Sequence, residues 1–470
     1  MNTRILGLLF LSFLFIFATI DLDNLFEYDN QTIPNYINKD NTPGNNQITN
    51  AGATLGRVLF YDKRLSANNT IACASCHLQE FAFSDIEQAS LGLNGGLTGR
   101  HAMRLVNSRF SNEGHFFWDE RANSLEQQTT QPIQDHVEMG YSGTDGDPGL
   151  TNLIDKLSGI EEYQRLFEFV YGDDLITEVR MQRALAQFVR SIQSFDSKFD
   201  DGLAMVNNMN DNFPNFTAQE NQGKRLFLSP PGGPNGGAGC NGCHQAPEFD
   251  IAPNAMNNGI IGVIGDPNAV DLTNTRAPSL RDLVNPDGQL NGPLMHDGSF
   301  NSLMEVIEHY NDITFNPAIN PLLDQRLIGP PGGGGQGQNL NLTDNEKQAL
   351  EAFLMTLTGS NIYTNPMYSD PFDADGTIEI LPVITALSDF EVDDLIQIYP
   401  NPSSQFIHFN GVEDTDYLIK IFDNSGKLLL EKMINQAEKS IDISALQDGM
   451  LHILMYDGNV LMFNKKVVKI

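Results

Sequence analysis

Cysteine, tryptophan and basic residues are all scarce in this sequence. Its 470 residues include four cysteines, one tryptophan, and 28 Lys plus Arg against 60 Asp plus Glu, for a formal net charge of -32. A surface of this sign repels phosphate backbones and anionic lipid headgroups, which argues against nucleic acid as a partner. The length and the 40% hydrophobic content predict a packed soluble protein of two to four domains.

The amino terminus carries a short apolar run behind a single basic residue. Arg4 precedes apolar residues from Ile5 to about Phe17, and small and acidic residues follow. This profile predicts a signal peptide over residues 1–20, followed by an N-terminal extension over 21–45. The run is shorter than the roughly 20 apolar residues of a spanning helix, and no cysteine follows it for lipidation. We therefore expect export without a stable membrane span.

All four cysteines lie in two copies of a Cys-x-x-Cys-His motif. A dithiol redox site or a zinc site would explain the spacing of each cysteine pair, but neither explains the histidine that follows both pairs. Covalent c-type haem explains every member, because two thiols form thioethers to the porphyrin and the adjacent imidazole binds the iron. The motifs thus predict two covalently bound haems, attached through Cys73, Cys76, Cys240 and Cys243, with His77 and His244 as axial ligands.

Helical patterns surround both motifs. Apolar residues recur at three- and four-residue steps from about Thr177 to Phe199, which predicts one long helix at the end of the first haem domain. Capping boxes predict two further helices, beginning after Thr217 and Thr343. A "GRVLF" or "GKRLF" segment precedes each cysteine pair, which suggests duplication of a small helical cytochrome unit.

The pattern changes beyond the second motif. Residues 361–393 are acidic and poor in periodicity, and we interpret them as a linker. Over residues 394–470, short β-type runs alternate with turn residues, without any cysteine. With haem domains over 46–215 and 216–360, the expected fold is mainly α: two c-type cytochrome-like helical haem domains, plus a small C-terminal all-β sandwich.

Longer segments give a specific family resemblance. Four of them accompany the haem motifs: "LGRVLFYDKRLS", "FFWDERANSLEQQTTQPIQDHVEMG", "APSLRDL" and "MHDGSFNSLMEVIEHYN". On these motifs, residues 46–360 resemble the bacterial di-haem cytochrome c peroxidase family, which includes the MauG-type enzymes. The C-terminal module opens with "IYPNPSS" and ends with basic "KKVVK", and it is similar to type IX secretion sorting domains.

The resemblance implies catalytic roles at the first haem. Peroxide reduction takes two electrons and two protons, and a second haem can store one oxidising equivalent away from the reacting iron. In the family pattern Glu138 is the proton-transfer group, and Gln128 hydrogen-bonds the oxygen ligand. Trp118 matches the tryptophan that the family places between its haems. Without the resemblance, Glu138 would be read as a solvated surface acid and Trp118 as a core residue.

The sixth ligand of the second haem decides the subtype. In the family, the sixth ligand lies at a fixed distance after the segment that contains His296 in this sequence, and that position is Tyr310. Classical peroxidases have methionine there, and MauG-type enzymes have tyrosine. A tyrosine phenolate ligand lowers the reduction potential of the haem iron compared with a methionine ligand. The alternative is that Tyr310 packs on its helix while Met295 or Met304 binds the iron.

The sequence departs from the classical peroxidases at two positions. Leu93 or Asn94 stands where they carry a distal histidine that blocks the first iron, so we expect no need for reductive activation. His101 lies near an asparagine position that helps bind calcium between the domains, so one calcium ion stays an open expectation. His136, beside Glu138 in sequence, is expected to be structural or exposed.

These inferences predict an exported peroxidase that reduces hydrogen peroxide to water. Electrons would come from a small redox protein, such as a cytochrome c or a cupredoxin, and the acidic surface favours a basic one. Two alternatives stay open: a MauG-like oxidase that modifies side chains of a partner protein, and a non-catalytic di-haem electron carrier. Type IX machinery would carry the protein from the periplasm to the cell surface or the medium. Oligomeric state is open, with a homodimer as one option.

Overall fold

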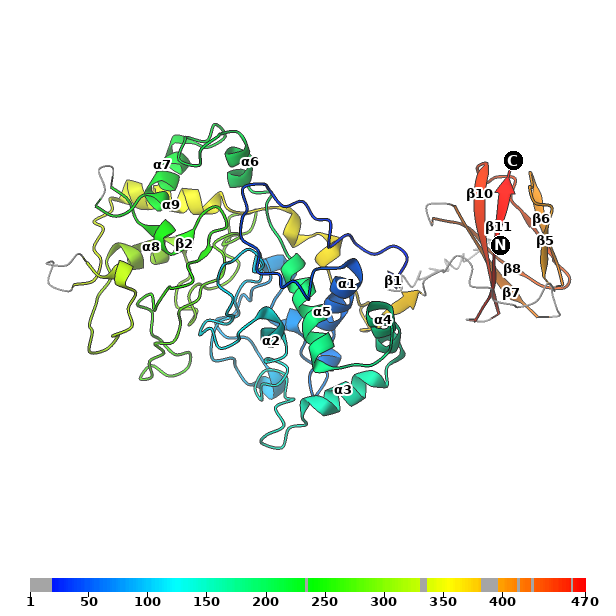
Figure 1. The fold of residues 1–470 in the computed structure, drawn as a ribbon, viewed down its shortest axis with the longest axis horizontal. Coiled ribbons are helices and arrows are strands. Elements are labelled where there is room, and N and C mark those ends of the chain that lie inside the picture. Colours follow the sequence, from blue (N-terminus) through cyan, green and yellow to red (C-terminus); the bar gives the residue numbers. More distant parts are fainter. Residues whose placement is uncertain are drawn as a thin grey trace, which may run out of the picture. The chain divides into compact units, whose positions relative to one another are not determined.

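The chain divides into two compact units, Met1–Val383 and Ile384–Ile470. The computed structural model describes residues 19–232, 236–329, 336–381, 396–411, 415–423, 427–457 and 460–470. Almost all of the predicted signal peptide lies outside these described residues. Both predicted haem domains belong to the first unit, with α1 to α5 toward one end and α6 to α9 toward the other (Figure 1).

The first haem domain is built on two packed helices, α1 (Asn50–Tyr61) and α5 (Glu178–Ser191). Three shorter helices complete it: α2 (Leu125–Thr129), α3 (Leu150–Ser158) and α4 (Glu161–Tyr171). Gly56 of α1 lies so close to α5 that an added Cβ would meet the Ala184 carbonyl oxygen at 2.0 Å. Only glycine permits this approach, and it lets the apolar faces of both helices join one core.

The long helix predicted from Thr177 to Phe199 is interrupted. Helix α5 begins after Thr177, whose hydroxyl caps it, but ends at Ser191. The Asn107 side chain then bonds both the N–H and the carbonyl of Ser194, at 2.9 and 3.0 Å. Residues 192–196 form no helix, although apolar residues continue at helical spacing across this break.

The second haem domain repeats the packed pair of the first. Its helices are α7 (Ala218–Leu228), α8 (Leu303–Asn311) and α9 (Asp344–Met355). Helix α6 (Lys198–Ala204) lies before the predicted boundary at residue 216, but its Phe199 is buried in the second core against Phe353 of α9. A Cβ on Gly223 of α7 would meet the Ala349 carbonyl oxygen of α9 at 1.8 Å, which parallels the contact of Gly56 with α5. Both predicted capping boxes are formed, at Thr217 and Thr343. The shared glycine contact supports the expected duplication.

Helices are the main regular elements of both haem domains, but irregular segments occupy more of each domain than helices do. The expected "mainly α" fold therefore overstates the helix content. Loops here are fixed by backbone and side-chain hydrogen bonds rather than by repeating structure.

None of the helices in the described part of the chain has the length and apolar content needed to cross a membrane.

The segment after residue 360 differs from the predicted linker. Ile362, Tyr368 and Ile378 are buried in the core of the first haem domain. Strand β4 (Glu379–Leu381) pairs in parallel with β1 (Thr19–Asp21). The boundary between units falls at residue 383, so residues 361–381 belong to the haem-binding unit. Acidic composition and weak periodicity concealed this packing.

The C-terminal unit is a two-sheet sandwich, as predicted. One sheet has the order β5-β6-β9 and the other β11-β10-β7-β8. The strands are β5 (Gln397–Tyr399), β6 (Phe406–Asn410), β7 (Tyr417–Phe422), β8 (Leu428–Ile434), β9 (Ser440–Asp442), β10 (Gly449–Asp457) and β11 (Val460–Lys469). Isoleucines dominate the core between the sheets, including Ile407, Ile419, Ile441 and Ile453.

A buried ion pair fixes α6 within the haem-binding unit. The Arg281 guanidinium donates two hydrogen bonds of 2.8 Å to the Asp200 carboxylate, which also accepts one of 2.7 Å from the Tyr36 hydroxyl. Both charged side chains are buried. Removal of one partner would leave a charge uncompensated in a low-dielectric interior.

We therefore expect Asp200→Asn to lower the free energy of unfolding of the haem-binding unit by about 3–5 kcal/mol. Denaturant titration of the haem-loaded protein, followed in the Soret band, measures the change. Glu161→Gln, which breaks the exposed pair with Arg165 on α4, serves as the control and should change stability little. Equal stability of the two variants would contradict a structural role for the buried pair.

Candidate functional site

A cavity of about 560 Å³ lies beside the first Cys-x-x-Cys-His motif. Its lining includes Cys76, His77, Trp118, Gln128 and Glu138, so the structure brings the predicted catalytic residues to the first motif. Cys73–Ser75 form a 3-10 turn, and the N–H groups of residues 76 and 77 donate to the carbonyl of residue 73 at 3.2 and 3.0 Å. The turn explains how one short segment presents two thiols and an imidazole.

The His77 ring is half-buried and oriented by hydrogen bonding to the backbone. Its Nδ1 donates to the Phe83 carbonyl at 3.1 Å, which leaves Nε2 free to bind a metal. Burial lowers the pKa of His77, and this favours the neutral imidazole that ligates iron. The Phe60 ring packs against it at a centroid distance of 6.4 Å.

Glu138 is half-buried at the end of a tight turn. The Asp135 carboxylate accepts hydrogen bonds from the N–H groups of Val137 and Glu138, at 2.8 and 3.0 Å. Burial raises the pKa of Glu138 to about 7, the Asp135 charge adds to the rise, and the Arg121 guanidinium opposes it. A carboxyl group with this pKa can both accept and return a proton near neutral pH. Arg121 also lines the cavity. It lies in the same family-like segment as Trp118, but no feature of the sequence assigned it a role.

The loop at Leu93 packs behind Glu138 without entering the cavity. The Leu93 N–H donates to the carbonyls of Val137 and Glu138, at 2.7 and 3.1 Å. Neither Leu93 nor Asn94 lines the cavity. His101, later in the same loop, does line it, but both of its ring nitrogens contact other protein groups, the Glu87 carbonyl and the Ser84 hydroxyl. His136 is exposed and bonds the Asp147 carboxylate through Nδ1 at 2.8 Å, as expected for a structural or surface residue.

A second cavity, of about 590 Å³, lies beside the second motif. Cys240–Gly242 form a 3-10 turn, and the short strands β2 (His244–Gln245) and β3 (Asp250–Ile251) follow it. The cavity lining includes Cys240, Cys243, His244, Met295 and Tyr310. The predicted haem ligands of the second site therefore share one cavity.

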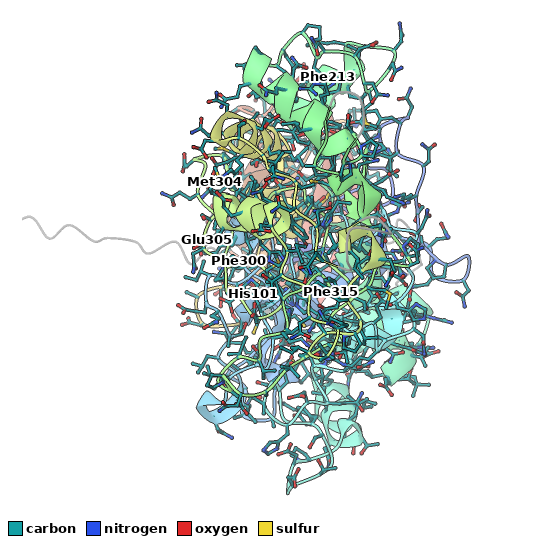
Figure 2. The ribbon with its side chains drawn as sticks, turned by 90° about the vertical axis from the view of Figure 1, so that its left-hand side faces the viewer. His101, Phe213, Phe300, Met304, Glu305 and Phe315 are labelled. Carbon is teal, nitrogen blue, oxygen red and sulfur yellow. The ribbon has the colours of Figure 1, made fainter. Side chains whose placement is uncertain are left out.

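Helix α8 presents one face to this second cavity. Leu303, Val306, Ile307 and Tyr310 recur at helical spacing in its lining, and Met304 is not among them. Figure 2 shows Met304 beside Glu305 on the outer side of this helix, and Glu305 is exposed. Of the three ligands considered from sequence, the structure thus leaves Tyr310 and Met295 at the cavity.

The two cavities share one wall, and Trp118 is part of it. Residues 101–104, 118 and 276–278 line both cavities. The indole Nε1 of Trp118 donates to the His101 carbonyl at 2.8 Å. The N–H groups of Thr275 and Arg276 donate to the Trp118 carbonyl at 2.9 and 3.1 Å. Trp118 thus lies in the wall between the two cavities, and its role in electron transfer stays a prediction.

The donor atoms around both cavities fit haem. The four cysteines form no disulfide. Arg104 is buried in the shared wall, and its Nε has no hydrogen-bond partner among the described residues. A buried guanidinium with an unused donor suits an anionic group such as a haem propionate. His244 is half-buried, and its buried Nδ1 is likewise without a partner among the described residues, unlike that of His77.

His101, which lies near the family's calcium-binding asparagine position, does not offer a ligand suited to that ion. His101 is buried, its Nδ1 donates to the Glu87 carbonyl at 3.0 Å, and its Nε2 lies 3.4 Å from the Ser84 hydroxyl oxygen. Both ring nitrogens thus have protein partners, and calcium prefers oxygen ligands. His101 instead joins the two haem domains through its backbone.

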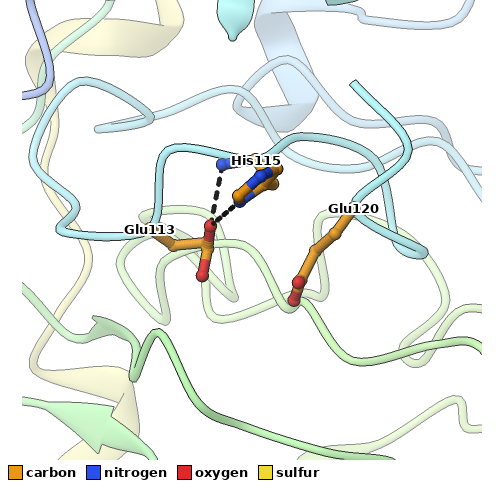
Figure 3. Close-up of side chains that lie close together, drawn as sticks. All are labelled: Glu113, His115 and Glu120. Carbon is orange, nitrogen blue, oxygen red and sulfur yellow. Dashed lines mark hydrogen bonds and ion pairs between the residues drawn. The ribbon is translucent and has the colours of Figure 1, made fainter. Parts of the chain in front are cut away.

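A separate group of three side chains lies next to Trp118 in sequence. Ligand atoms of Glu113, His115 and Glu120 all lie within 4.8 Å of one another. Figure 3 shows the Glu113 carboxylate accepting hydrogen bonds from the backbone and the ring of His115, while Glu120 approaches from the other side. The Arg276 guanidinium donates to the His115 carbonyl at 2.6 Å and brings positive charge to this group. We assign no metal to it.

Comparisons with known proteins agree with the geometry. Residues 50–208 match the model of the di-haem cytochrome c peroxidase family, and residues 397–469 match that of the secretion system C-terminal sorting domain. Methylamine utilization protein MauG of Methylophilus methylotrophus is 32% identical over 276 residues, which span 57% of this chain and 74% of the relative. Cytochrome-c peroxidase IdrP1 of Pseudomonas sp. (strain SCT) is 27% identical over 390 residues, 72% of this chain and 88% of the relative.

A solved structure is similar over the same region. The crystal structure of a MauG-like protein associated with microbial copper homeostasis aligns with a TM-score of 0.57 and 29% identity. The alignment covers 73% of this chain and 99% of that protein. The similarity therefore extends through both haem domains, beyond the residues that the family model matches.

Two matched double variants test the attachment of haem to each motif. We expect Cys240→Ser with Cys243→Ser to lower covalently bound haem from two to one per chain, because both thioethers at the second site are lost. Cys73→Ser with Cys76→Ser should give the same count with loss of the other haem. Intact mass under denaturing conditions measures both. Two haems retained on either variant would contradict the assignment.

Proposed function

The chain belongs to the di-haem cytochrome c peroxidase and MauG family, and we propose that it is an exported c-type peroxidase with two covalently bound haems. It reduces hydrogen peroxide to water, consuming two electrons and two protons for each two waters formed. The electrons come from a small redox protein, a cytochrome c or a cupredoxin. The observation that carries this proposal is the presence of Glu138 and Gln128 in one cavity with His77, next to a wall shared with the second haem cavity.

The proton transfers are assigned to Glu138. When bound, the haems supply the electrons and the iron to which peroxide coordinates. The Glu138 carboxylate accepts the proton of the bound peroxide and returns it to the departing oxygen, and this favours cleavage of the O–O bond. Gln128 hydrogen-bonds the oxygen and orients it. Arg121, which lines the same cavity, favours the ionised form of Glu138 that the first transfer requires.

Electron entry is assigned to the second haem, and Trp118 is the residue between the two cavities. His244 and Tyr310, which line the same cavity, would hold the iron of the second haem, and two protein ligands would leave no position on it for peroxide. Neither Leu93 nor Asn94 lines the first cavity, and the ring nitrogens of His101 are bonded to protein groups, so no side chain of this loop would cover an iron held by His77. Peroxide would then reach that iron without prior reduction of the second haem.

A second candidate function is a MauG-like oxidase that modifies side chains of a partner protein. Tyr310 at the second cavity and the absence of a histidine at Leu93 favour it, as does the 32% identity to a MauG protein. Fast peroxide turnover with reduced cytochrome or a dye donor supports the peroxidase. Slow turnover with oxidation of partner side chains supports the oxidase. A non-catalytic electron carrier would instead have two six-coordinate irons that do not react with peroxide.

The C-terminal sandwich is proposed to act in secretion. Residues 397–469 match a secretion sorting domain, so we assign export through the signal peptide and then passage by type IX machinery to the cell surface or the medium. The haem-binding unit ends before this sandwich, so removal of the sandwich would leave both haem sites complete.

We expect Glu138→Gln to lower kcat/KM for peroxide by about 10²- to 10⁴-fold, with both haem spectra unchanged. In the wild-type protein kcat/KM should rise as pH increases through about 7, because the carboxylate is the proton acceptor and burial has raised its pKa to that value. The variant should lose this dependence. Glu80→Gln, on an exposed residue outside the cavity, is the matched control. Unchanged turnover in Glu138→Gln would exclude the assigned role.

The net charge of -32 predicts an electrostatic component in donor binding. With a basic electron-donor protein, we expect kcat/KM for the donor to fall as ionic strength rises, because salt screens the attraction. A neutral dye donor provides the control and should show little salt dependence. A basic donor whose turnover is insensitive to salt would argue against this mode of recognition.

A further inference from the structure

The second cavity contains two side chains that can bind iron, and one amide contacts both of them. Asn258 lines the cavity with Met295 and Tyr310. Its Nδ2 donates to the Tyr310 hydroxyl oxygen at 3.2 Å and to the Met295 sulfur at 3.4 Å. No sequence motif pointed to Asn258.

The Asn258 amide is held in a defined orientation. Its Oδ1 accepts a hydrogen bond from the Ile260 N–H at 3.1 Å, so the NH₂ group is the end that faces the two ligands. The Asn258 carbonyl accepts a bond of 2.9 Å from His309 Nε2, which ties this loop to the last turn of α8. Next to it, the buried Asn257 carboxamide oxygen accepts bonds from Gly259 and Asn320, at 2.8 and 2.7 Å. The donor is therefore fixed relative to Tyr310.

The hydrogen bonds from Asn258 to Tyr310 and to Met295 would differ in strength when the acceptor side chain binds iron. A coordinated tyrosine is a phenolate, and an N–H bond to an anionic oxygen is roughly twice as strong as one between neutral groups. A thioether sulfur is only a weak acceptor. The same amide therefore favours coordination by Tyr310 over coordination by Met295, although both side chains are within reach of the cavity.

We propose that Asn258 is a positioning residue that selects Tyr310 over Met295 as the sixth ligand of the second haem. This inference rests on the proposed function, in which Tyr310 binds that iron. Asn258 does not touch substrate. It acts by donating to the phenolate oxygen, and Met295 is the ligand that takes its place when the donor is lost.

The test is the ferric spectrum of haem-loaded Asn258→Leu, which keeps the approximate size of the side chain but removes both N–H groups. We expect loss of the tyrosinate charge-transfer absorption and appearance of the weak near-infrared band of methionine-ligated ferric haem. The midpoint potential of the second haem should rise in parallel. In Asn258→Leu with Met295→Leu, the near-infrared band should be absent. Asn254→Leu is the control, since Asn254 is exposed in the same segment and outside the cavity lining.

The Tyr310→Phe variant tests separately whether Tyr310 binds the iron of the second haem, the assignment on which this inference rests. If Tyr310→Phe leaves the second haem spectrum unchanged, Tyr310 is not the ligand and the assigned coordination fails. If Tyr310→Phe alters the spectrum while Asn258→Leu retains the full tyrosinate spectrum, Tyr310 binds iron without selection by Asn258, and the inference is overturned. Haem content and circular dichroism verify that each variant is folded and loaded.

Discussion

The functional site depends on a few backbone hydrogen bonds that join the two haem domains at Trp118. The indole donates to the His101 carbonyl, and the N–H of His101 donates to the His296 carbonyl at 2.8 Å. Arg100 strengthens the junction with ion pairs to Asp119 and Asp271, both at 2.7 Å. Because these bonds leave little freedom between the domains, two cavities with separate cysteine motifs share one wall.

The two cavities differ in the groups that line them. The first cavity contains an acid with a pKa near neutrality, an amide and a guanidinium, which together can bind and protonate a small oxidant. The second is lined by the apolar face of α8 and contains Tyr310, which can occupy the iron itself. A duplicated helical unit, with Gly56 and Gly223 in equivalent contacts, thus carries two different chemistries. The difference lies in loops and single side chains rather than in the helices.

Much of this arrangement was predictable, because each Cys-x-x-Cys-His motif is local in sequence. The two motifs, the capping boxes at Thr217 and Thr343 and the C-terminal sandwich all rest on short-range patterns, and the structure agrees with them. The break in the helix after Ser191 and the packing of residues 361–381 depend on partners distant in sequence, which periodicity cannot report. The Asn258 contacts were missed for the same reason: residues 258, 295 and 310 meet only in the folded chain.

The most direct test of this arrangement is the rate of electron transfer between the two haems across Trp118. The haem-loaded Trp118→Phe variant, with its second haem reduced, is mixed with peroxide, and reoxidation of that haem is followed by stopped-flow absorbance. We expect reoxidation to be much slower than in the wild-type protein, while the initial reaction of peroxide at the first haem keeps its rate. Reoxidation at the wild-type rate would contradict a route through the shared wall at Trp118.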